Sequence, residues 1–276
     1  MAKTVPLLQR LVEEGYFPDQ KTAAAWVLGG KVYVNGQRAR SGQRVDVQAT
    51  LSVPELALRY ASRGGYKLEG ALQAFDVDVR GRVCIDAGAS TGGFTDCLLQ
   101  HGAGKVYAVD VGFGQLTGAL RQDARVVNLE RTNISDESLL SLCPRPTLGT
   151  CDLSYLSLTK AVPYYDRILG GQGELLCLVK PLFETSDAEA GRTGKMSDDA
   201  YAPLLKDLVH TLEQDNALSV RGVAASPVTG SGGTVEFFLH IALGTIEHRR
   251  NLHRDIDHSV QRALTLLHKE KDNADV

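Results

Sequence analysis

The stretch VCIDAGASTGG at residues 83–93 decides the fold of most of this chain. Its first three residues are apolar and lead to Asp86 in a short predicted strand, and the glycines that follow allow the backbone to turn into a helix and to approach a ligand closely. A dinucleotide-binding loop of the form G-x-G-x-x-G would need a glycine where Ser90 stands. We therefore expect this loop to bind a ligand other than a dinucleotide.

Outward from this loop, short apolar runs alternate with helix-like stretches. The runs lie at 83–86, 105–111, 125–130, 146–154 and 173–180, and the helix-like stretches at 67–75, 92–101, 115–122, 157–169 and 199–215. This alternation predicts an α/β fold with a mostly parallel sheet covered on both faces. The runs at 218–228 and 233–243 have no helix between them and predict an antiparallel hairpin at one sheet edge. Residues 255–268 have the apolar spacing of an amphipathic helix.

Length and composition exclude several classes of protein. The 276 residues, 43% hydrophobic and 23% charged, suit one large globular domain and a small module, and not a disordered chain. No uncharged apolar run approaches the ~18 residues that a membrane helix needs, and the N-terminus lacks the apolar core of a secretory signal. We therefore expect a cytoplasmic protein without stable membrane insertion. The five cysteines form no C-x-x-C pair and the histidines show no metal-ligand spacing, so we predict no metal.

Charge is distributed unevenly along the chain. Residues 1–67 contain ten Lys or Arg and five Asp or Glu, a net charge of +5, whereas the remainder carries −8. A basic first quarter on an acidic body indicates that a polyanion docks at the N-terminal side.

The first fifty residues have the pattern of a compact module. Residues 7–14 and 20–28 predict two short helices, the second capped by Asp19, and Asn35-Gly36 is a hairpin turn signal. The order helix, G-x-x-x-x-x-K, helix, G-x-V-x-V-N-G resembles the S4 RNA-binding domain. We therefore predict a small α+β S4-like domain at 1–51, a linker at 52–62 and the large domain at 63–276. The expected RNA-binding residues are Lys21, Lys31, Arg38, Arg40 and Arg63.

The glycine loop and the next two strand ends indicate a nucleoside-type cofactor. The spacing D-x-G-x-x-x-G-G at residues 86–93 resembles the first motif of methyltransferases, whose loop admits the amino-acid end of S-adenosylmethionine. Asp110 ends the second strand, where an acid accepts both ribose hydroxyls of an adenosine. Glu130 and Asn133 follow the third strand and are expected near the adenine. The predicted cofactor-binding residues are Asp86, Gly88, Ser90, Thr91, Gly92, Gly93, Asp110, Glu130 and Asn133.

Four further polar residues stand at or beside strand ends: Lys67, Asp152, Lys180 and Glu236. A lysine at the end of the apolar run LLCLV needs a nearby acid, because burying an unpaired ammonium is unfavourable. Strand ends of an α/β sheet converge on the ligand crevice, so we expect these four side chains to form one catalytic site.

This K-D-K-E set resembles the tetrad of RNA 2′-O-methyltransferases of the FtsJ class. Over nearly its whole length the chain resembles the TlyA family of haemolysin/rRNA 2′-O-methyltransferases, most specifically in SRGGYKL at 62–68, CDLSYLSL at 151–158 and LVKPLFE at 178–184. The resemblance implies a Rossmann-like methyltransferase that transfers a methyl group to a ribose 2′-OH of ribosomal RNA, with rRNA or ribosomal subunits as partner. Lys180 would be central, either taking the proton as an amine or steadying the alkoxide as a cation. Asp152 would orient it, and Lys67 and Glu236 would hold the ribose.

Three alternatives compete with this interpretation. A haemolysin-type, membrane-active protein would need a spanning helix or amphipathic barrel strands, and a non-catalytic RNA-binding protein would not need the four charged residues. A base methyltransferase would typically carry an N/D-P-P-Y/F motif for a flipped base, whereas the fourth strand here ends in CDLSYLSL.

Overall fold

The structure is a computed structural model that describes residues 4–14, 16–17, 19–54, 59–185, 187–215, 217–230, 233–244 and 251–274. The chain divides into two compact units, residues 1–59 and 60–276. The boundary between them falls within the stretch expected to be a linker, of which residues 55–58 lie outside the described residues.

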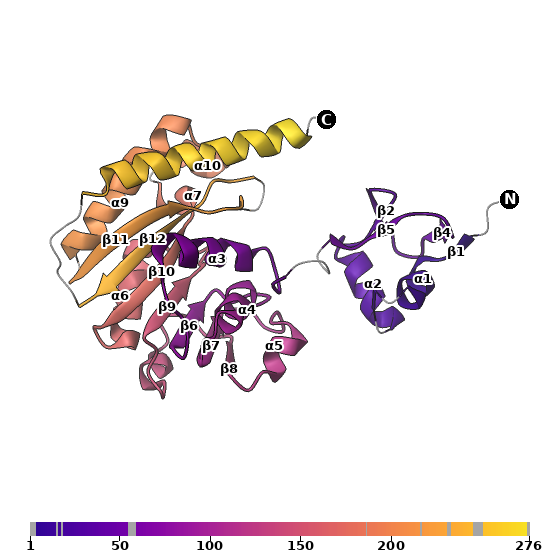
Figure 1. Cartoon of the computed structure of the whole chain (residues 1–276), viewed down its shortest axis with the longest axis horizontal. Helices are drawn as coiled ribbons and strands as arrows, with labels where there is room; N and C mark the ends of the chain where they lie inside the picture. Colours follow the sequence, from indigo (N-terminus) through magenta and orange to yellow (C-terminus); the bar gives the residue numbers. More distant parts are fainter. Residues whose placement is uncertain are drawn as a thin grey trace. The chain divides into compact units, whose positions relative to one another are not determined.

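In the residues that the structure describes, the first unit has two helices and two small sheets, which are labelled in Figure 1. The helices are α1 (Leu7–Glu13) and α2 (Gln20–Leu28), and the strands are β1 (Thr4–Pro6), β2 (Tyr33–Val34), β3 (Gln37–Arg38), β4 (Arg44–Asp46) and β5 (Leu51–Ser52). Asp19 caps α2 as expected, since its Oδ1 accepts a hydrogen bond from the backbone N–H of Thr22 at 2.7 Å. Asn35 and Gly36, both with positive φ, form the turn between β2 and β3.

The hairpin predicted from the Asn35-Gly36 turn is present, and it is short. β2 and β3 pair over two residues each, and the 44–46 segment pairs with β1 instead of continuing the hairpin. A turn between Arg40 and Gln43 redirects the chain, because the Gln43 side chain accepts a hydrogen bond from the Arg40 N–H.

The second unit is built on a seven-stranded sheet in the order β11-β12-β10-β9-β6-β7-β8. Its strands are β6 (Val83–Ala87), β7 (Lys105–Asp110), β8 (Val126–Glu130), β9 (Leu148–Cys151), β10 (Gly173–Val179), β11 (Leu218–Ala225) and β12 (Phe237–Leu243). The five strands β10, β9, β6, β7 and β8 pair in parallel in that order, and β12 pairs antiparallel with both β10 and β11. The predicted α/β fold, mostly parallel with an antiparallel hairpin at one edge, is confirmed.

Helices cover both faces of this sheet (Figure 1). One face carries α3 (Gly64–Phe75), α4 (Gly93–Gln100) and α5 (Gly118–Gln122), and the other carries α6 (Leu158–Leu169), α9 (Tyr201–Asp215) and α10 (His253–Ala274). The short helices α7 (Pro181–Glu184), α8 (Ala188–Thr193), η2 (Glu137–Ser141) and η3 (Asp198–Ala200) lie in the connections. A hydrophobic core lies on each face of the sheet, and successive residues of β10 point to opposite faces. Leu176 packs toward α3 and α4, and Cys177 packs toward α6 and α9.

The residues expected to be functional lie together at the carboxyl ends of the parallel strands. The parallel strands β6, β7, β8, β9 and β10 all end there, and the antiparallel β12 begins there, because Val179 and Phe237 are register partners. Lys180 after β10 and Glu236 before β12 are therefore brought to the same place by strands that run in opposite directions.

Candidate active site

The glycine loop between β6 and α4 packs tightly against the end of β9. Gly88 has φ +84, and a Cβ atom there would lie 2.4 Å from the backbone oxygen of Asp152. Gly92 has φ +101, and a Cβ atom there would meet the side chain of Leu120 at 2.2 Å. Both positions combine a left-handed backbone with no room for a side chain, so only glycine fits them.

Asp86, the first residue of the motif, lies beneath the loop. Its carboxylate is fully buried and accepts hydrogen bonds from the hydroxyls of Thr95 at 2.7 Å and Thr150 at 2.9 Å. Burial raises the pKa of the Asp86 carboxyl to about 6, although both hydroxyls favour its charged form. The structure thus places Asp86 where it joins β6, β9 and α4 under the loop, and not among the residues that line the cavities described next.

A cavity of about 230 Å³ opens beside the ends of β6 and β7. Asp110 lines it and fixes the loop edge: one carboxylate oxygen accepts from the Ser90 N–H at 2.7 Å and the other from the Gly112 N–H at 2.6 Å. Asp110, Gly88 and Ser90 are therefore brought together as the sequence predicted.

Glu130 and Asn133 do not line this cavity. The Glu130 carboxylate forms an ion pair with Arg121, and the Asn133 side chain accepts from the backbone and hydroxyl of Ser135 at 3.0 Å. The cavity is instead lined by Gln115, Thr132, Ile134 and Tyr155, which sequence reasoning missed. Thr132 and Ile134 flank Asn133, so the strand end was located but the inward-pointing side chains were not.

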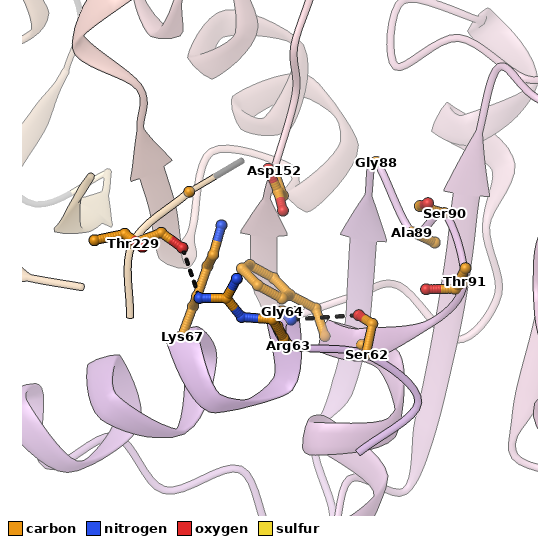
Figure 2. A pocket seen from close by; sticks show the side chains of 13 residues that line it. Ser62, Arg63, Gly64, Lys67, Gly88, Ala89, Ser90, Thr91, Asp152 and Thr229 are labelled. Atoms are coloured by element: carbon orange, nitrogen blue, oxygen red, sulfur yellow. Dashed lines mark hydrogen bonds between the residues drawn. The ribbon is translucent and has the colours of Figure 1, made fainter. Parts of the chain in front are cut away.

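A second cavity, of about 210 Å³, lies at the start of α4 (Figure 2). Thr91 and Gly93 line it from the loop, and Arg63 from the turn before α3. The Arg63 guanidinium donates to the backbone oxygen of Thr229 at 3.3 Å. Arg63 was expected to contact RNA, yet it lies beside the glycine loop. Its charge and the backbone N–H groups at the start of α4 make this cavity suitable for a carboxylate.

The four charged residues expected to be catalytic all line a third cavity, of about 350 Å³. Lys67, which rises from α3 toward the strand ends in Figure 2, forms an ion pair with Glu236, with 2.5 Å between Nζ and Oε2. Lys180 forms an ion pair with Asp152, and its Nζ also donates to the Ser154 hydroxyl at 2.9 Å.

These two pairs differ in burial. Lys67 and Glu236 are 9% and 5% exposed, and burial raises the pKa of Glu236 while the charge of Lys67 opposes that rise. The side chains of Lys180 and Asp152 are more open, at 17% and 23% exposure. The inner pair is suited to a fixed electrostatic role, and the outer pair is accessible to a substrate.

Asp152 lines all three cavities. The glycine-loop cavities and the four-residue cavity therefore meet at one carboxylate, and two bound molecules can approach each other there. The described part of the chain holds no group of three or more His, Cys, Asp or Glu side chains placed to bind a metal ion.

The four remaining basic residues named from the sequence belong to the first unit. Lys21, Arg38 and Arg40 are exposed, and Lys31 lies over the Trp26 ring with its Nζ 5.2 Å from the centroid. The Arg38 guanidinium covers Gly30, so Lys31 and Arg38 are close together at the end of α2, whereas Lys21 lies at its start.

The fold and the site together define a methyltransferase. They comprise a Rossmann-like sheet with a glycine loop, an acid at the end of the second strand, and a Lys–Asp and a Lys–Glu pair at the strand ends. The sequence profile of the family described as FtsJ-like methyltransferase matches residues 60–243. The chain belongs to this family, and its methyl donor is S-adenosylmethionine.

Several relatives resemble the chain over most of its length. It is 40% identical over 234 residues to the putative rRNA methyltransferase YqxC of Bacillus subtilis, covering 84% of this chain and 83% of YqxC. It is 38% identical over 247 residues to the 16S/23S rRNA (cytidine-2′-O)-methyltransferase TlyA of Mycobacterium tuberculosis, covering 89% of this chain and 92% of TlyA. The solved structure of a putative hemolysin from Streptococcus thermophilus superposes with a TM-score of 0.75 at 32% identity, covering 99% of this chain and 100% of that one.

The name hemolysin raises the question of membrane contact. Among the residues that the structure describes, no helix is both long and apolar enough to cross a membrane.

Proposed function

We propose that this protein transfers a methyl group from S-adenosylmethionine to a ribose 2′-OH of ribosomal RNA. The observation that carries the proposal is the meeting of the glycine-loop cavities with the Lys67–Asp152–Lys180–Glu236 cavity at Asp152. The printed name of the tuberculosis relative, a cytidine-2′-O-methyltransferase of 16S and 23S rRNA, supports the choice of substrate.

The residues around the glycine loop fit S-adenosylmethionine. Asp110 presents a carboxylate that accepts ribose hydroxyls, and Arg63 with the N–H groups at the start of α4 suits the carboxylate of the amino-acid end. Gly88 allows the loop to lie directly against the backbone of Asp152, and both residues line the same cavity. When bound, the cofactor supplies a methyl group already activated by its sulfonium.

Lys180 is the group we assign to the target oxygen. An ammonium has three N–H donors, and two of them are directed to Asp152 and Ser154. We propose that the third donates to the 2′-oxygen of a ribose in the same cavity. Lys180 forms an ion pair with the Asp152 carboxylate, and we propose that it acts as a cation that steadies the developing alkoxide while the 2′-OH proton is released to water. Lys67 and Glu236 form the inner wall that positions the ribose.

The first unit would dock the RNA. We propose that residues 1–51 form an S4-like domain that contacts phosphates through Lys21, Lys31, Arg38 and Arg40. The net charge of +5 over residues 1–67 supports this role. Ribosomal RNA as substrate would place the protein in the cytoplasm.

The test is methylation of purified ribosomal subunits and free rRNA with radiolabelled S-adenosylmethionine, followed by mass spectrometry of the nucleosides. We expect label in a 2′-O-methylated nucleoside, at a linkage that resists alkaline cleavage because its 2′-OH is blocked. Label on a base, or no label in any RNA supplied, would contradict the proposal.

A further inference from the structure

A fourth cavity lies outside the active site, against helix α10. It has a volume of about 420 Å³ and is bounded by the segment after β11 and by one stripe of α10. We call it the α10 groove, and its main lining residues are Ser226, Pro227, His258, Arg262, Thr265 and Lys269. The spacing of the α10 residues places them on one side of the helix, and from His258 to Lys269 the stripe is roughly 16 Å long at 1.5 Å per residue.

The α10 groove combines the cations Arg262 and Lys269 with polar side chains and with the apolar Pro227 and Leu266, and none of its described lining residues is a carboxylate. Asp257, which precedes His258, is paired with Lys206 of α9 at 2.9 Å and does not line the groove. Among the side chains that the structure describes, Arg262 and Lys269 have no ion-pair partner, and both are exposed. The groove is therefore suited to an anion.

The α10 groove adjoins the active site through a single short segment. Ser226, at the groove, donates its backbone N–H to the backbone oxygen of Glu236 at 2.9 Å. Pro227 packs against α3, where a Cβ atom at Gly70 would lie 2.6 Å from its ring, one turn beyond Lys67. Thr229, in the same segment, lines the cavity at the start of α4 together with Arg63. A bound polymer that enters the cavity lined by Lys67, Asp152, Lys180 and Glu236 can thus continue across this segment into the groove.

We propose that the α10 groove binds the phosphate backbone of the RNA strand that carries the target nucleotide. The proposal rests on the function proposed above, which places a nucleotide beside Lys67 and Glu236. Arg262 has the geometry for a two-pronged contact with a phosphate, and Lys269 and His258 extend the row of donors along the helix. The length of the stripe accommodates more than one successive phosphate. An acidic peptide would also be attracted by these charges. The adjacent cavity, to which the proposed function assigns a ribose, favours RNA instead.

The test compares two double variants of the full-length protein. Arg262→Ala/Lys269→Ala removes two charges from the groove. Arg145→Ala/Arg167→Ala removes two charges at the amino ends of the parallel strands, beside the start of β9 and the end of α6. Binding of labelled rRNA is measured over a range of salt concentrations. For the groove variant we expect ~10-fold weaker binding and a log–log salt slope shallower by about 1.4–1.8, the effect of two lost phosphate contacts. The control should match the wild type.

Steady-state kinetics supply a second measurement. The groove variant should raise KM for rRNA and leave kcat and S-adenosylmethionine affinity unchanged, because it leaves the tetrad and the glycine loop intact. Binding and a salt slope equal to those of the wild type would overturn the proposal, and so would competition by polyglutamate as effective as that by RNA. If the wild type methylates ribose but the groove variant behaves like the wild type, only the groove proposal fails. If the wild type methylates no ribose, the proposed function fails, and the binding comparison still decides the groove.

Discussion

Lys67 on α3 and Glu236 before β12 form a nearly solvent-free ion pair, with 2.5 Å between Nζ and Oε2, although the two residues are at opposite ends of the domain sequence. The pair joins a helix on one sheet face to the strand hairpin at the edge. It therefore contributes to the fold of the edge as well as to the shape of the cavity that it lines.

The Lys67–Glu236 ion pair predicts that substitutions at these two residues have strongly non-additive effects on the free energy of unfolding. Lys67→Ala leaves the buried carboxylate of Glu236 without its counter-charge, which should destabilise the protein by about 3–5 kcal/mol. The double variant Lys67→Ala/Glu236→Ala should lose clearly less than the sum of the two single variants, since it leaves no unpaired charge. Urea unfolding of the three variants and the wild type measures the coupling, and additive losses would show that the pair is not coupled in solution.

The tight approach of the glycine loop to β9 predicts which glycine is essential. Gly88→Ala should weaken S-adenosylmethionine binding by more than ~10-fold, because the new methyl group would displace the loop from the backbone of Asp152. Gly81→Ala is the matched control: its φ of +70 imposes a similar backbone strain, but nothing lies within 4 Å of the added atom. Isothermal titration should find near wild-type affinity for the control. Equal losses in both variants would mean that backbone strain, and not the contact, is responsible.

The buried carboxyl of Asp86 predicts a dependence of stability on pH. Its pKa is raised from 3.8 to about 6 by burial, so in the interval between these values the folded protein holds a proton that the unfolded chain has lost. Its contribution to stability is complete below the lower value and is lost as the pH rises through about 6. The change is on the order of 3 kcal/mol.

Asp86→Asn removes this titration and keeps a group that can hydrogen bond to Thr95 and Thr150. The difference in free energy of unfolding, wild type minus variant, should therefore decrease between about pH 4 and about pH 7. Denaturant unfolding across this range measures it. A difference that is flat, or that increases with pH, would contradict the raised pKa.

The charge of the first unit predicts how RNA affinity depends on salt. Arg38→Ala/Arg40→Ala should weaken rRNA binding and make its salt slope shallower by about 1.4–1.8, because two phosphate contacts are lost. Cofactor binding should not change, since both residues belong to the first unit. Filter binding at several salt concentrations measures the slope, with Arg145→Ala/Arg167→Ala again as the charge-matched control. A slope equal to that of the wild type would remove Arg38 and Arg40 from the RNA contact.

The sequence predicted the architecture and the position of the site because both follow from repeating patterns. Alternating apolar runs set the sheet, and strand ends set the edge where Asp110, Asp152 and Lys180 meet. It could not predict which side chains near a strand end point inward. Arg131 has φ +55, which turns the chain after β8, so Thr132 and Ile134 line the cavity while Asn133 caps its own loop. That local conformation has no signal in the residue pattern.

The α10 stripe illustrates a different limit. The apolar spacing of Ile256, Val260, Leu264 and Leu267 predicted a packed helix. Ile256 and Val260 are buried, and Leu264 and Leu267 are partly buried against the same core. The polar side of such a helix carries no comparable pattern. Only the structure places Arg262 beside the segment that leads to Glu236.

The last prediction concerns Lys180, which separates an active enzyme from an RNA-binding protein with the same fold. Lys180→Ala removes the donor assigned to the 2′-oxygen and leaves Gly88 and Asp110 in place. The variant should fold and bind S-adenosylmethionine, yet lose methyl transfer by a factor on the order of 100 or more. Lys180→Arg should not restore the rate, because a guanidinium has a different shape and a different set of donor directions.

The matched control for Lys180 is Ser154→Ala. It removes the hydroxyl that accepts from Nζ but leaves the Asp152 ion pair, so its loss should be clearly smaller. A single-turnover assay with saturating cofactor measures the methyl-transfer step for each variant, and titration calorimetry checks cofactor binding. A near wild-type rate for Lys180→Ala would show that Lys180 does not meet the 2′-oxygen. If the variant is inactive only because it no longer folds or binds cofactor, then Lys180 belongs to a structural ion pair with Asp152.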